Sequence, residues 1–459
     1  RDQPRSRGLG DVYKRQTLLA VPDATGTPGA VNSVFAGNIG PTYRDMVHNP
    51  VVPSAMESVT VSILAEDYQD VASMKLKYAV AGGAFQSVNM NDVGGGRYEG
   101  NIPAQSTSAI VQFYVEGVDS QGAVSTFPAA GAESRALYKV QDNQARTGSQ
   151  IHNFRIIMTS DDAEMMFDPT KIMSNGRIGS TVIYNESEVF YDVGTRAAGS
   201  NAARGEINAA RINFNVRFDS MRLFRGVHRT VAIDRSGHGM VRDSQDEILM
   251  KHIGNRAGNI PYQYDDLTYF IAPQSRFNRP AQLLLARQSD VFLDSQFDNG
   301  SEGTVFKFDI PYVPTNTDGG SEGSKLPSPY SHPGPHMDLQ DLGDDKEFYR
   351  AHYYIRNNRR QDDYTQIIKM AKTFELTGTA LEVAAYNVID VDQWTRTFAL
   401  LSLIGWLDAI TQHPSNHNIK FYVRPSDHKV LALPWDWDYA YRQPTSSPLI
   451  GGSGNSSRT

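Results

Sequence analysis

The sequence contains no cysteine among its 459 residues. A chain without thiols forms no disulfide bonds, holds no metal ion through thiolates and carries no cysteine nucleophile. The absence does not fix a redox compartment, and it is compatible with an exported protein that avoids misoxidation. Thiol chemistry is therefore excluded, whereas localisation stays open.

Long apolar runs and an excess of positive charge are also missing. The most apolar helical stretch, residues 398–407, is too short to cross a bilayer and runs into Asp408. The formal net charge is −7, whereas nucleic acids and anionic membranes bind basic surfaces. We therefore expect no nucleic-acid partner and no transmembrane segment in this sequence.

The length and composition predict a multidomain globular chain. With 40% hydrophobic and 21% charged residues, the composition is ordinary for folded soluble domains, and the length predicts two or three of them. Residues 1–16 have a basic composition that differs from the remainder and resemble translated adapter sequence. We expect this segment to be non-native and the chain to be open at both ends.

Residues 17–40 contain one short apolar strand followed by a stretch rich in proline and glycine. The pattern resembles the closing strand and tail of lamin-tail-like domains. A plain linker is the alternative interpretation.

Residues 41–140 show an all-β pattern. Apolar residues alternate with period two at 59–64, 74–80 and 110–116, and glycine-rich turns separate these runs. The pattern predicts a β-sandwich of about 100 residues and is similar to bacterial immunoglobulin-like or fibronectin-type modules. We expect a spacer, or a module for contact with a cell surface or extracellular matrix.

A polar linker is expected at residues 141–150, and from residue 151 the pattern becomes mixed α and β. A short helix should begin at residues 160–162. Strands are predicted at residues 151–159, 179–185, 189–195 and 212–218.

The segment 406–441 places polar side chains at the ends of apolar elements. A predicted helix over residues 393–407, capped by residues 390–392, ends at Asp408, and a polar loop containing Asn418 follows. A hairpin then leads to the sequence Pro-Trp-Asp-Trp-Asp at residues 434–438. Phosphoryl transfer requires a carboxylate for the acceptor proton, and an amide and a carboxylate for the metal. Each residue alone could equally be a turn former or a solvated acid.

This segment resembles the spore coat protein H (CotH) kinase-like family of atypical protein kinases. The shared features are an acid after an apolar helix, an asparagine before an aromatic strand, and a Pro-Trp-Asp-x-Asp signature. The resemblance spans residues 151–441. It implies an α+β atypical protein-kinase-like domain at residues 151–459, without the C-terminal helices expected after the signature. The predicted fold is therefore an all-β immunoglobulin-like sandwich followed by this domain.

The resemblance also implies a reaction, in which the γ-phosphoryl group of ATP passes to Ser or Thr of a protein with the help of Mg²⁺. Asp408 would orient or deprotonate the hydroxyl, Asn418 and Asp436 would hold Mg²⁺, and Asp438 would support them or hold a second ion. The phosphoacceptor would be an exported or surface protein, which places the reaction outside a bacterial cell or at its surface.

A nucleotide site is implied upstream of this segment. The loop at residues 197–205, with Gly199, Ser200 and Asn201, could direct backbone N–H groups at phosphates, although an ordinary hairpin loop is the alternative. Arg211 occupies a place where the family usually has lysine.

Residues 243–256 predict a helix with Ile248, Leu249 and Ile253 on its apolar face. By analogy with kinases, Glu247 on this helix would pair with a cation that binds phosphate. A solvated helix charge is the alternative.

Two departures from the family favour other functions. Arginine is no substitute for a positioned lysine, so Arg211 puts nucleotide binding in doubt. Ala286 stands where members carry a glutamate near the nucleotide. A non-catalytic surface adhesin or pseudokinase on the same scaffold is the alternative function. A carbohydrate-processing enzyme is a third, and would require Asp408 and Asp436 about 5 to 9 Å apart in an open groove.

The remaining segments carry weaker signals. The insertion at residues 314–344 contains His332 and His336, and we interpret it as a loop because two histidines without fixed carboxylates make a poor metal site. Residues 347–375 predict one polar helix, either solvated or on the side that faces the substrate.

Overall fold

The computed structural model describes residues 29, 35–168, 171, 174–199, 212–234, 245–288, 290–308, 314–315, 326–327, 339–350, 352–404 and 418–437. The chain divides into two compact units. Unit 1 comprises Arg1–Phe167, Gly176–Thr195 and Tyr269–Arg279, and unit 2 comprises Asp168–Asn175, Arg196–Thr268 and Pro280–Thr459. The expected non-native segment and, apart from Gly29, the expected lamin-tail-like segment as far as residue 34 lie outside the described residues.

Unit 1 contains two antiparallel sheets. The first has the order β1(Thr42–Asn49), β2(Val59–Glu66), β6(Arg97–Ile102), β5(Asn91–Gly94). The second has the order β4(Gln86–Asn89), β3(Val71–Val80), β7(Ile110–Asp119), β8(Val124–Phe127), with β9(Leu137–Lys139) also paired to β7. The strands predicted at 59–64, 74–80 and 110–116 are therefore confirmed as parts of β2, β3 and β7.

Alternating burial creates the core of these sheets. Along β7 every second residue is buried, so Val111, Phe113 and Val115 point to one side. They share an apolar cluster with Val61 and Ile63 of β2. A strand of period two buries one face only, and the two sheets therefore bury their apolar faces in a common core.

A histidine lies inside this core. His48 is 3% exposed, and its Nδ1 lies 2.5 Å from the Tyr191 hydroxyl while its Nε2 lies 2.9 Å from the Val51 carbonyl oxygen. Since a carbonyl only accepts, Nε2 carries the proton and the Tyr191 hydroxyl donates to Nδ1. Burial lowers the pKa of His48 to about 4, so the imidazole is neutral at neutral pH.

The strands and the helix predicted after residue 150 are present. They are β10(His152–Ile157), α2(Ser160–Phe167), β11(Ile178–Tyr184) and β12(Glu188–Ala198). A small apolar cluster joins β9 to this group through Leu137, Ile157, Ile183 and Val189. Unit 1 therefore continues beyond the expected linker at residues 141–150, because this apolar surface is buried against it.

One buried arginine anchors that linker. Arg155 of β10 is 2% exposed. Its guanidinium donates to Asp142 Oδ2 at 2.9 Å and to Glu186 Oε2 at 2.9 Å. Burial opposes the charged form, but Glu186 and Asp142 together raise the pKa of Arg155 above its ordinary value. The segment between the strands is thus held by a buried, fully paired cation.

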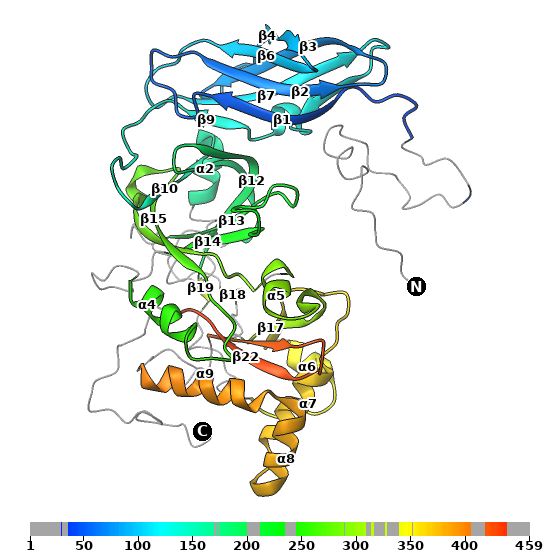
Figure 1. The fold of residues 1–459 in the computed structure, drawn as a ribbon, viewed down its shortest axis with the longest axis vertical. Helices are drawn as coiled ribbons and strands as arrows, with labels where there is room; N and C mark the ends of the chain where they lie inside the picture. The colour runs from blue at the N-terminus through cyan, green and yellow to red at the C-terminus, as the bar shows by residue number, and fades with distance from the viewer. Residues whose placement is uncertain are drawn as a thin grey trace. The chain divides into compact units, whose positions relative to one another are not determined.

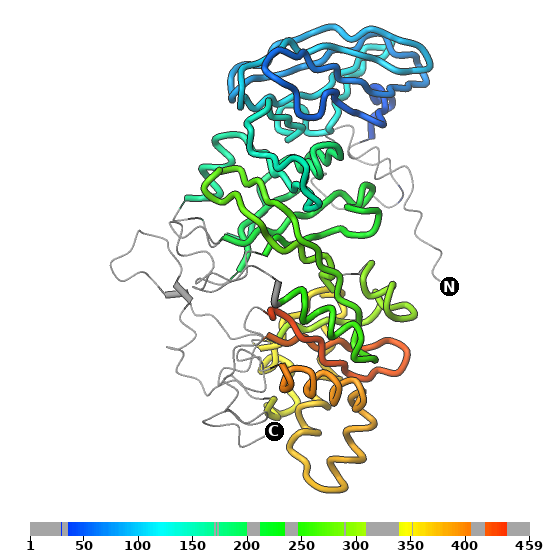
Figure 2. Tube along the Cα trace, turned by 60° about the vertical axis from the view of Figure 1, so that its left-hand side comes forward, coloured from blue at the N-terminus to red at the C-terminus, as the bar shows by residue number. Residues whose placement is uncertain are grey.

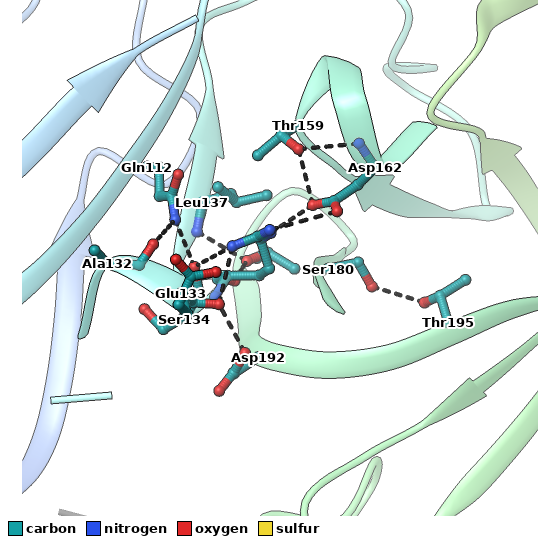
Figure 3. A network of polar contacts seen from close by, with 12 residues as sticks. Gln112, Ala132, Glu133, Ser134, Leu137, Thr159, Asp162, Ser180, Asp192 and Thr195 are labelled. Carbon is teal, nitrogen blue, oxygen red and sulfur yellow. Dashed lines mark hydrogen bonds and ion pairs between the residues drawn. The ribbon is translucent and has the colours of Figure 1, made fainter. Parts of the chain in front are cut away.

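A polar network reinforces the same region (Figure 3). Arg135 pairs with Asp162 of α2, and the Thr159 hydroxyl both donates to Asp162 Oδ2 at 2.8 Å and accepts from its backbone N–H at 3.2 Å. Thr159 therefore caps α2 one residue before the predicted start. Leu137 N–H donates to the Thr181 hydroxyl at 2.9 Å, which ties β9 to β11.

Seven strands form a closed barrel in the order β10-β11-β12-β13-β14-β16-β15. The remaining members are β13(Asn213–Arg217), β14(Thr230–Asp234), β15(Asp265–Ile271) and β16(Arg279–Leu284). The strand predicted at 212–218 is thus confirmed as β13. The helix α4(Gln245–Gly254) follows β14 in the chain and lies within the range predicted for it.

The C-terminal part of unit 2 is built on an antiparallel sheet of order β20-β17-β21-β22. Its strands are β20(Tyr353–Ile355), β17(Thr304–Phe308), β21(Ile419–Val423) and β22(Val430–Pro434). Helices α7(Thr365–Phe374), α8(Gly378–Val388) and α9(Val391–Leu403) contribute to the core beneath one face of it (Figures 1 and 2). The shorter helices are α5(Asp290–Gln296) and α6(Lys346–Arg350), and β18(Pro314–Thr315) pairs with β19(Leu326–Pro327).

The single helix predicted over residues 347–375 is wrong. The segment contains the end of α6, then β20, then α7. Asn358 and Asp362 between them have left-handed φ angles of 47° and 48°, which a helix cannot continue through.

Helix α9 fixes the position of β22. Asp390 caps the helix by accepting from Gln393 N–H at 3.2 Å, as predicted. The Gln393 side chain donates to the Ala432 carbonyl at 2.7 Å and accepts from its N–H at 2.9 Å. Trp394 Nε1 donates to the Val430 carbonyl at 2.8 Å. Among the helices of the described residues, none combines the length and hydropathy needed to cross a bilayer.

Candidate functional site

The structure brings two of the predicted metal ligands together. Asn418 precedes β21 and Asp436 follows β22, whose register pairs Ile419 with Pro434. Between them, Trp435 N–H donates to the Asn418 carbonyl at 3.0 Å. The hairpin therefore places both residues at the same end of the sheet, as the sequence pattern indicated.

Both residues adopt a left-handed backbone conformation. Asn418 has φ 63° and Asp436 has φ 67°, in a region that asparagine and aspartate enter more readily than other residues with a side chain. Asn418 is buried and Asp436 is exposed, so the carboxylate is accessible to a ligand.

The other predicted ligands are mostly outside the described residues. This holds for Asp408, Asp438, Ser200, Asn201 and Arg211. Gly199 is described, directly after β12, with φ 98°. Their predicted roles stay predictions.

Glu247 is a buried member of an ion-pair cluster and not a solvated helix charge. It is 2% exposed, and its Oε1 lies 2.9 Å from Nζ of Lys251, one turn further along α4. Lys251 also pairs with Asp265 at the start of β15. Glu247 thus pairs with a cation of its own helix, and its pairing with a cation that binds phosphate stays a prediction. The spacing of Glu247 and Lys251, four residues apart on a predicted helix, is a sequence pattern that indicates such a pair.

The apolar face predicted for α4 is wrong. Leu249 is 48% exposed and Ile253 is 36% exposed, whereas Met250 is 0% exposed. The buried side of the helix contains Glu247, Met250 and Lys251, because the two charged groups neutralise each other there. A hydrophobic pattern cannot detect a buried face that includes an ion pair.

The ion-pair cluster contacts the segment that contains Asp436. Trp437 N–H donates to Glu247 Oε1 at 3.4 Å, and the Trp437 ring packs on Met250 and Leu400. Glu247 Oε2 is buried and has no hydrogen-bond partner among the described residues. Asp436 is thus attached to α4 through its neighbour.

In the ion-pair cluster, the positive charge of Lys251 is stabilised by the acids around it. Burial alone would lower the pKa of Lys251, but Asp265 and Glu247 raise it above its ordinary value. Asp234, at the end of β14, has its pKa raised well above normal by burial and then by Glu247 and Asp436.

On the other side of Asp436 lies a buried lysine that sequence reasoning missed. Lys420 of β21 is 7% exposed. Its Nζ lies 2.5 Å from Gln288 Oε1 and 3.2 Å from the centroid of the Trp435 ring. Among the described residues it has no ion-pair partner. An aromatic face and an amide oxygen stabilise a cation only in part.

Further cations surround this lysine. Lys307 is its register partner on β17, so the two side chains share a face of the sheet. The Arg287 guanidinium lies 4.7 Å from the same Trp435 ring. Burial lowers the pKa of Lys420 well below its ordinary value, and nearby Arg287, Arg356 and Lys307 act in the same direction, whereas the charge of Asp436 acts in the opposite direction. We name Arg287, Lys307, Arg356 and Lys420 the basic cluster.

The face of the sheet that carries Lys307 and Lys420 is apolar further along the strands. Val305, Tyr422 and Leu431 occupy the same face further along the strands and pack against α5 in an apolar cluster. Ala286, at the place where a family glutamate is expected, is 5% exposed and belongs to that apolar cluster. The departure at this position is therefore accommodated as core packing.

The arrangement suits an anionic ligand with a divalent cation. Amide and carboxylate oxygens are ligands that Mg²⁺ accepts, and it usually keeps waters and substrate phosphates as well. Within the described ranges, no three His, Cys, Asp or Glu side chains are placed to hold a metal ion. An ion at Asn418 and Asp436 would thus need oxygens from phosphate, water or residues outside those ranges. The basic cluster supplies charge for phosphate groups.

Residues 284–456 match the CotH kinase protein family. The CotH match includes Asn418, Asp436 and the whole basic cluster, and leaves residues 1–283 outside it. The C-terminal region is thus kinase-like at the level of the family, and Glu247 and Lys251 lie outside the matched range.

Other comparisons add little to the CotH match. No curated protein matches the chain. A crystal structure of the bromine derivative of BhCBM56 is 10% identical over 23% of this chain and 96% of its own, with a TM-score of 0.16. The solution structure of the fn3 domain of human collagen alpha-1(XX) is 16% identical over 26% of this chain and 100% of its own, with a TM-score of 0.18. TM-scores this low carry no argument about fold or function.

Proposed function

We propose that the CotH-matched region is an atypical protein kinase that transfers the γ-phosphoryl group of Mg²⁺-bound ATP to Ser or Thr of an exported or surface protein. The observation that supports this proposal best is the convergence of Asn418, Asp436 and buried Lys420 at one end of the β21–β22 hairpin. An amide, an acid and a cation in a partly desolvated place are the groups that phosphoryl transfer requires.

Each residue has a definite task in this proposal. The Asn418 amide oxygen and the Asp436 carboxylate would hold Mg²⁺, which when bound neutralises charge on the phosphate oxygens. Lys420, with the rest of the basic cluster, would orient the phosphates. Because burial removes the screening of water, a cation there acts more strongly than one on the surface.

The remaining group that the reaction requires is a proton acceptor, and we assign this role to Asp408 because of its place in the sequence pattern. It would accept the proton of the acceptor hydroxyl while the hydroxyl oxygen bonds to the γ-phosphorus. The bond from that phosphorus to the ADP oxygen breaks at the same time. The catalytic contribution is positional and electrostatic, with no covalent intermediate on the protein.

A second candidate is a non-catalytic surface adhesin or pseudokinase. The buried Ala286, in a place where the family has a glutamate near the nucleotide, favours it. In that case, unit 1 would provide contact with a cell surface or extracellular matrix, and the hairpin end would bind a ligand without turnover.

The test is transfer of labelled phosphate from γ-³²P-ATP to casein in the presence of Mg²⁺. We expect incorporation with the wild type and its loss in Asp408→Ala and Asp436→Ala. The matched control is Asp298→Ala, an exposed acid of unit 2 with no hydrogen bond or ion pair to the described residues; it should retain activity. Incorporation that persists in Asp436→Ala would overturn the assignment, and Mg²⁺–ATP binding without transfer would support the pseudokinase.

A further inference from the structure

A cavity of about 590 Å³ lies in unit 2. It is bounded by α4, by residues 225–230, by the start of β15 and by α5. The lining, which falls wholly within the described part of the chain, does not include Asn418, Lys420 or Asp436. The cavity therefore has a lining distinct from the proposed metal and phosphate ligands, although it shares Lys251 and Asp265 with the ion-pair cluster and its Gln263 donates to the Pro434 carbonyl at 3.4 Å.

The walls of the cavity are largely apolar. Val227, Ile248, Leu285, Val291 and Phe292 line it. Leu285 is 5% exposed and Phe292 is 8% exposed, so both are held firmly by the surrounding structure. Small-molecule sites typically have volumes of about 300 to 1,000 Å³ with walls of this kind. The cavity has the size and the apolar lining of such a site.

The charged groups on the lining are already paired with one another. The Arg225 guanidinium lies 2.6 Å from Asp266 Oδ2. Lys251 is paired with Asp265 and with Glu247 behind it. The Arg225–Asp266 pair is partly exposed to solvent, whereas Lys251 and Asp265 are buried. A charged ligand that displaced Lys251 or Asp265 from its partner would leave the other group buried without compensation. The lining therefore favours an uncharged ligand.

Three polar groups on the lining are still available to a ligand. The rings of His228 and His252 and the hydroxyl of Tyr264 have no hydrogen-bond partner among the described residues. Burial, and then the charge of Arg225, lowers the pKa of His228, which leaves a neutral ring with one donor and one acceptor nitrogen. A ligand that both donates and accepts would satisfy this set.

From these observations we propose that the cavity binds an uncharged, planar heteroaromatic molecule that carries both a hydrogen-bond donor and an acceptor. The apolar walls enclose its rings, and His228, His252 and Tyr264 bind its polar edge. The proposal does not rest on the proposed kinase activity, because it concerns different residues and a different class of ligand.

Benzimidazole is a suitable probe, because it is planar, uncharged at pH 7.5, and carries one N–H and one acceptor nitrogen. Binding to the full chain is measured by ligand-observed NMR without nucleotide or metal. Benzoate and benzamidine, of similar size but charged, serve as comparison ligands. We expect benzimidazole to bind at least about tenfold more tightly than either charged probe.

Two substitutions on α4 locate the binding. Ile248→Trp fills the cavity and should weaken benzimidazole binding at least about tenfold. Leu249→Trp adds the same side chain at the neighbouring position, which is 48% exposed, and should bind like the wild type. If Ile248→Trp does not fold, Val291→Trp tests the opposite wall with the same expectation.

The proposal is overturned if the folded wild type does not bind benzimidazole, or if it binds all three probes equally. It is also overturned if a folded cavity-filling variant binds benzimidazole as tightly as Leu249→Trp does. Neither result would bear on phosphate transfer at the hairpin end.

Discussion

Two buried cations, Arg155 in unit 1 and Lys420 in unit 2, occupy opposite kinds of environment. Arg155 is 2% exposed and pairs with two carboxylates. Lys420 is 7% exposed and has an amide oxygen and an aromatic ring as its contacts, with three further cations nearby. Their pKa values respond in opposite directions: that of Arg155 is raised and that of Lys420 is lowered.

The difference separates a charge that the fold pairs with carboxylates from a charge that it leaves without such a partner. A buried cation whose carboxylates come from the fold itself fastens segments together, as Arg155 does for the linker after β9. A buried cation without a carboxylate partner destabilises the fold. Its presence beside Asn418 and Asp436 is explained if an anionic ligand supplies the missing negative charge. Lys251 belongs to the first kind, since Glu247 and Asp265 surround it.

The largest expected effect comes from removing the structural cation. Arg155→Met leaves the carboxylate of Glu186 without its partner and that of Asp142 with Lys139 alone, and should destabilise unit 1 by about 3 kcal/mol. Urea denaturation measures the change. As a control, Arg44→Met removes the exposed pair with Glu66 and should cost no more than about 1 kcal/mol. Equal losses of unfolding free energy in both variants would contradict the claim that Arg155 stabilises the fold more than an exposed ion pair does.

The next effect concerns the neutral imidazole in the core of unit 1. The folded pKa of His48 is about 4 and its ordinary value is 6.5, so the unfolded chain binds the proton first. The stabilisation is complete above pH 6.5 and falls as the pH drops to 4, by about 3 kcal/mol in total. The measurement is the unfolding free energy of the wild type and of His48→Leu across this range. His48→Leu should lack this part of the pH dependence. If its unfolding free energy falls with pH as steeply as that of the wild type, His48 is not the group responsible.

The smallest effect on stability is expected at Lys420, and it has the opposite sign. Lys420→Met removes a buried charge and keeps the volume, so it should stabilise unit 2 by about 1 kcal/mol, because the gain exceeds the lost contact with the Trp435 ring. Thermal unfolding without ligand measures this. A loss of more than about 2 kcal/mol would show that the fold itself requires the charge, as it does for Arg155.

The sequence predicted much of the local structure. Period-two alternation located β2, β3 and β7, and Asp390 correctly marked the start of α9. The hairpin between Asn418 and Asp436 was also readable, because a short turn between two apolar runs forces their ends together. These features depend on neighbours in the chain, which a pattern records directly.

What the sequence did not reveal depends on distant partners. Lys420 is buried and lies opposite Lys307 because β21 pairs with β17, a strand more than a hundred residues away in the sequence. The buried face of α4 was missed because Glu247 and Lys251 are polar in the pattern but neutralise each other in the fold. The helix predicted over residues 347–375 failed at Asn358, where a left-handed φ interrupts it.

The most direct test of the account is calorimetric titration of Mg²⁺–ATP into the wild type, Lys420→Met and the control Asp298→Ala, each shown to be folded. We predict that the wild type and Asp298→Ala bind with affinities within about twofold of each other, and that Lys420→Met binds at least about tenfold more weakly although it is no less stable. Equal binding by Lys420→Met and the wild type, or no binding by the folded wild type, would contradict the claim that the unpaired buried lysine is kept for an anionic nucleotide.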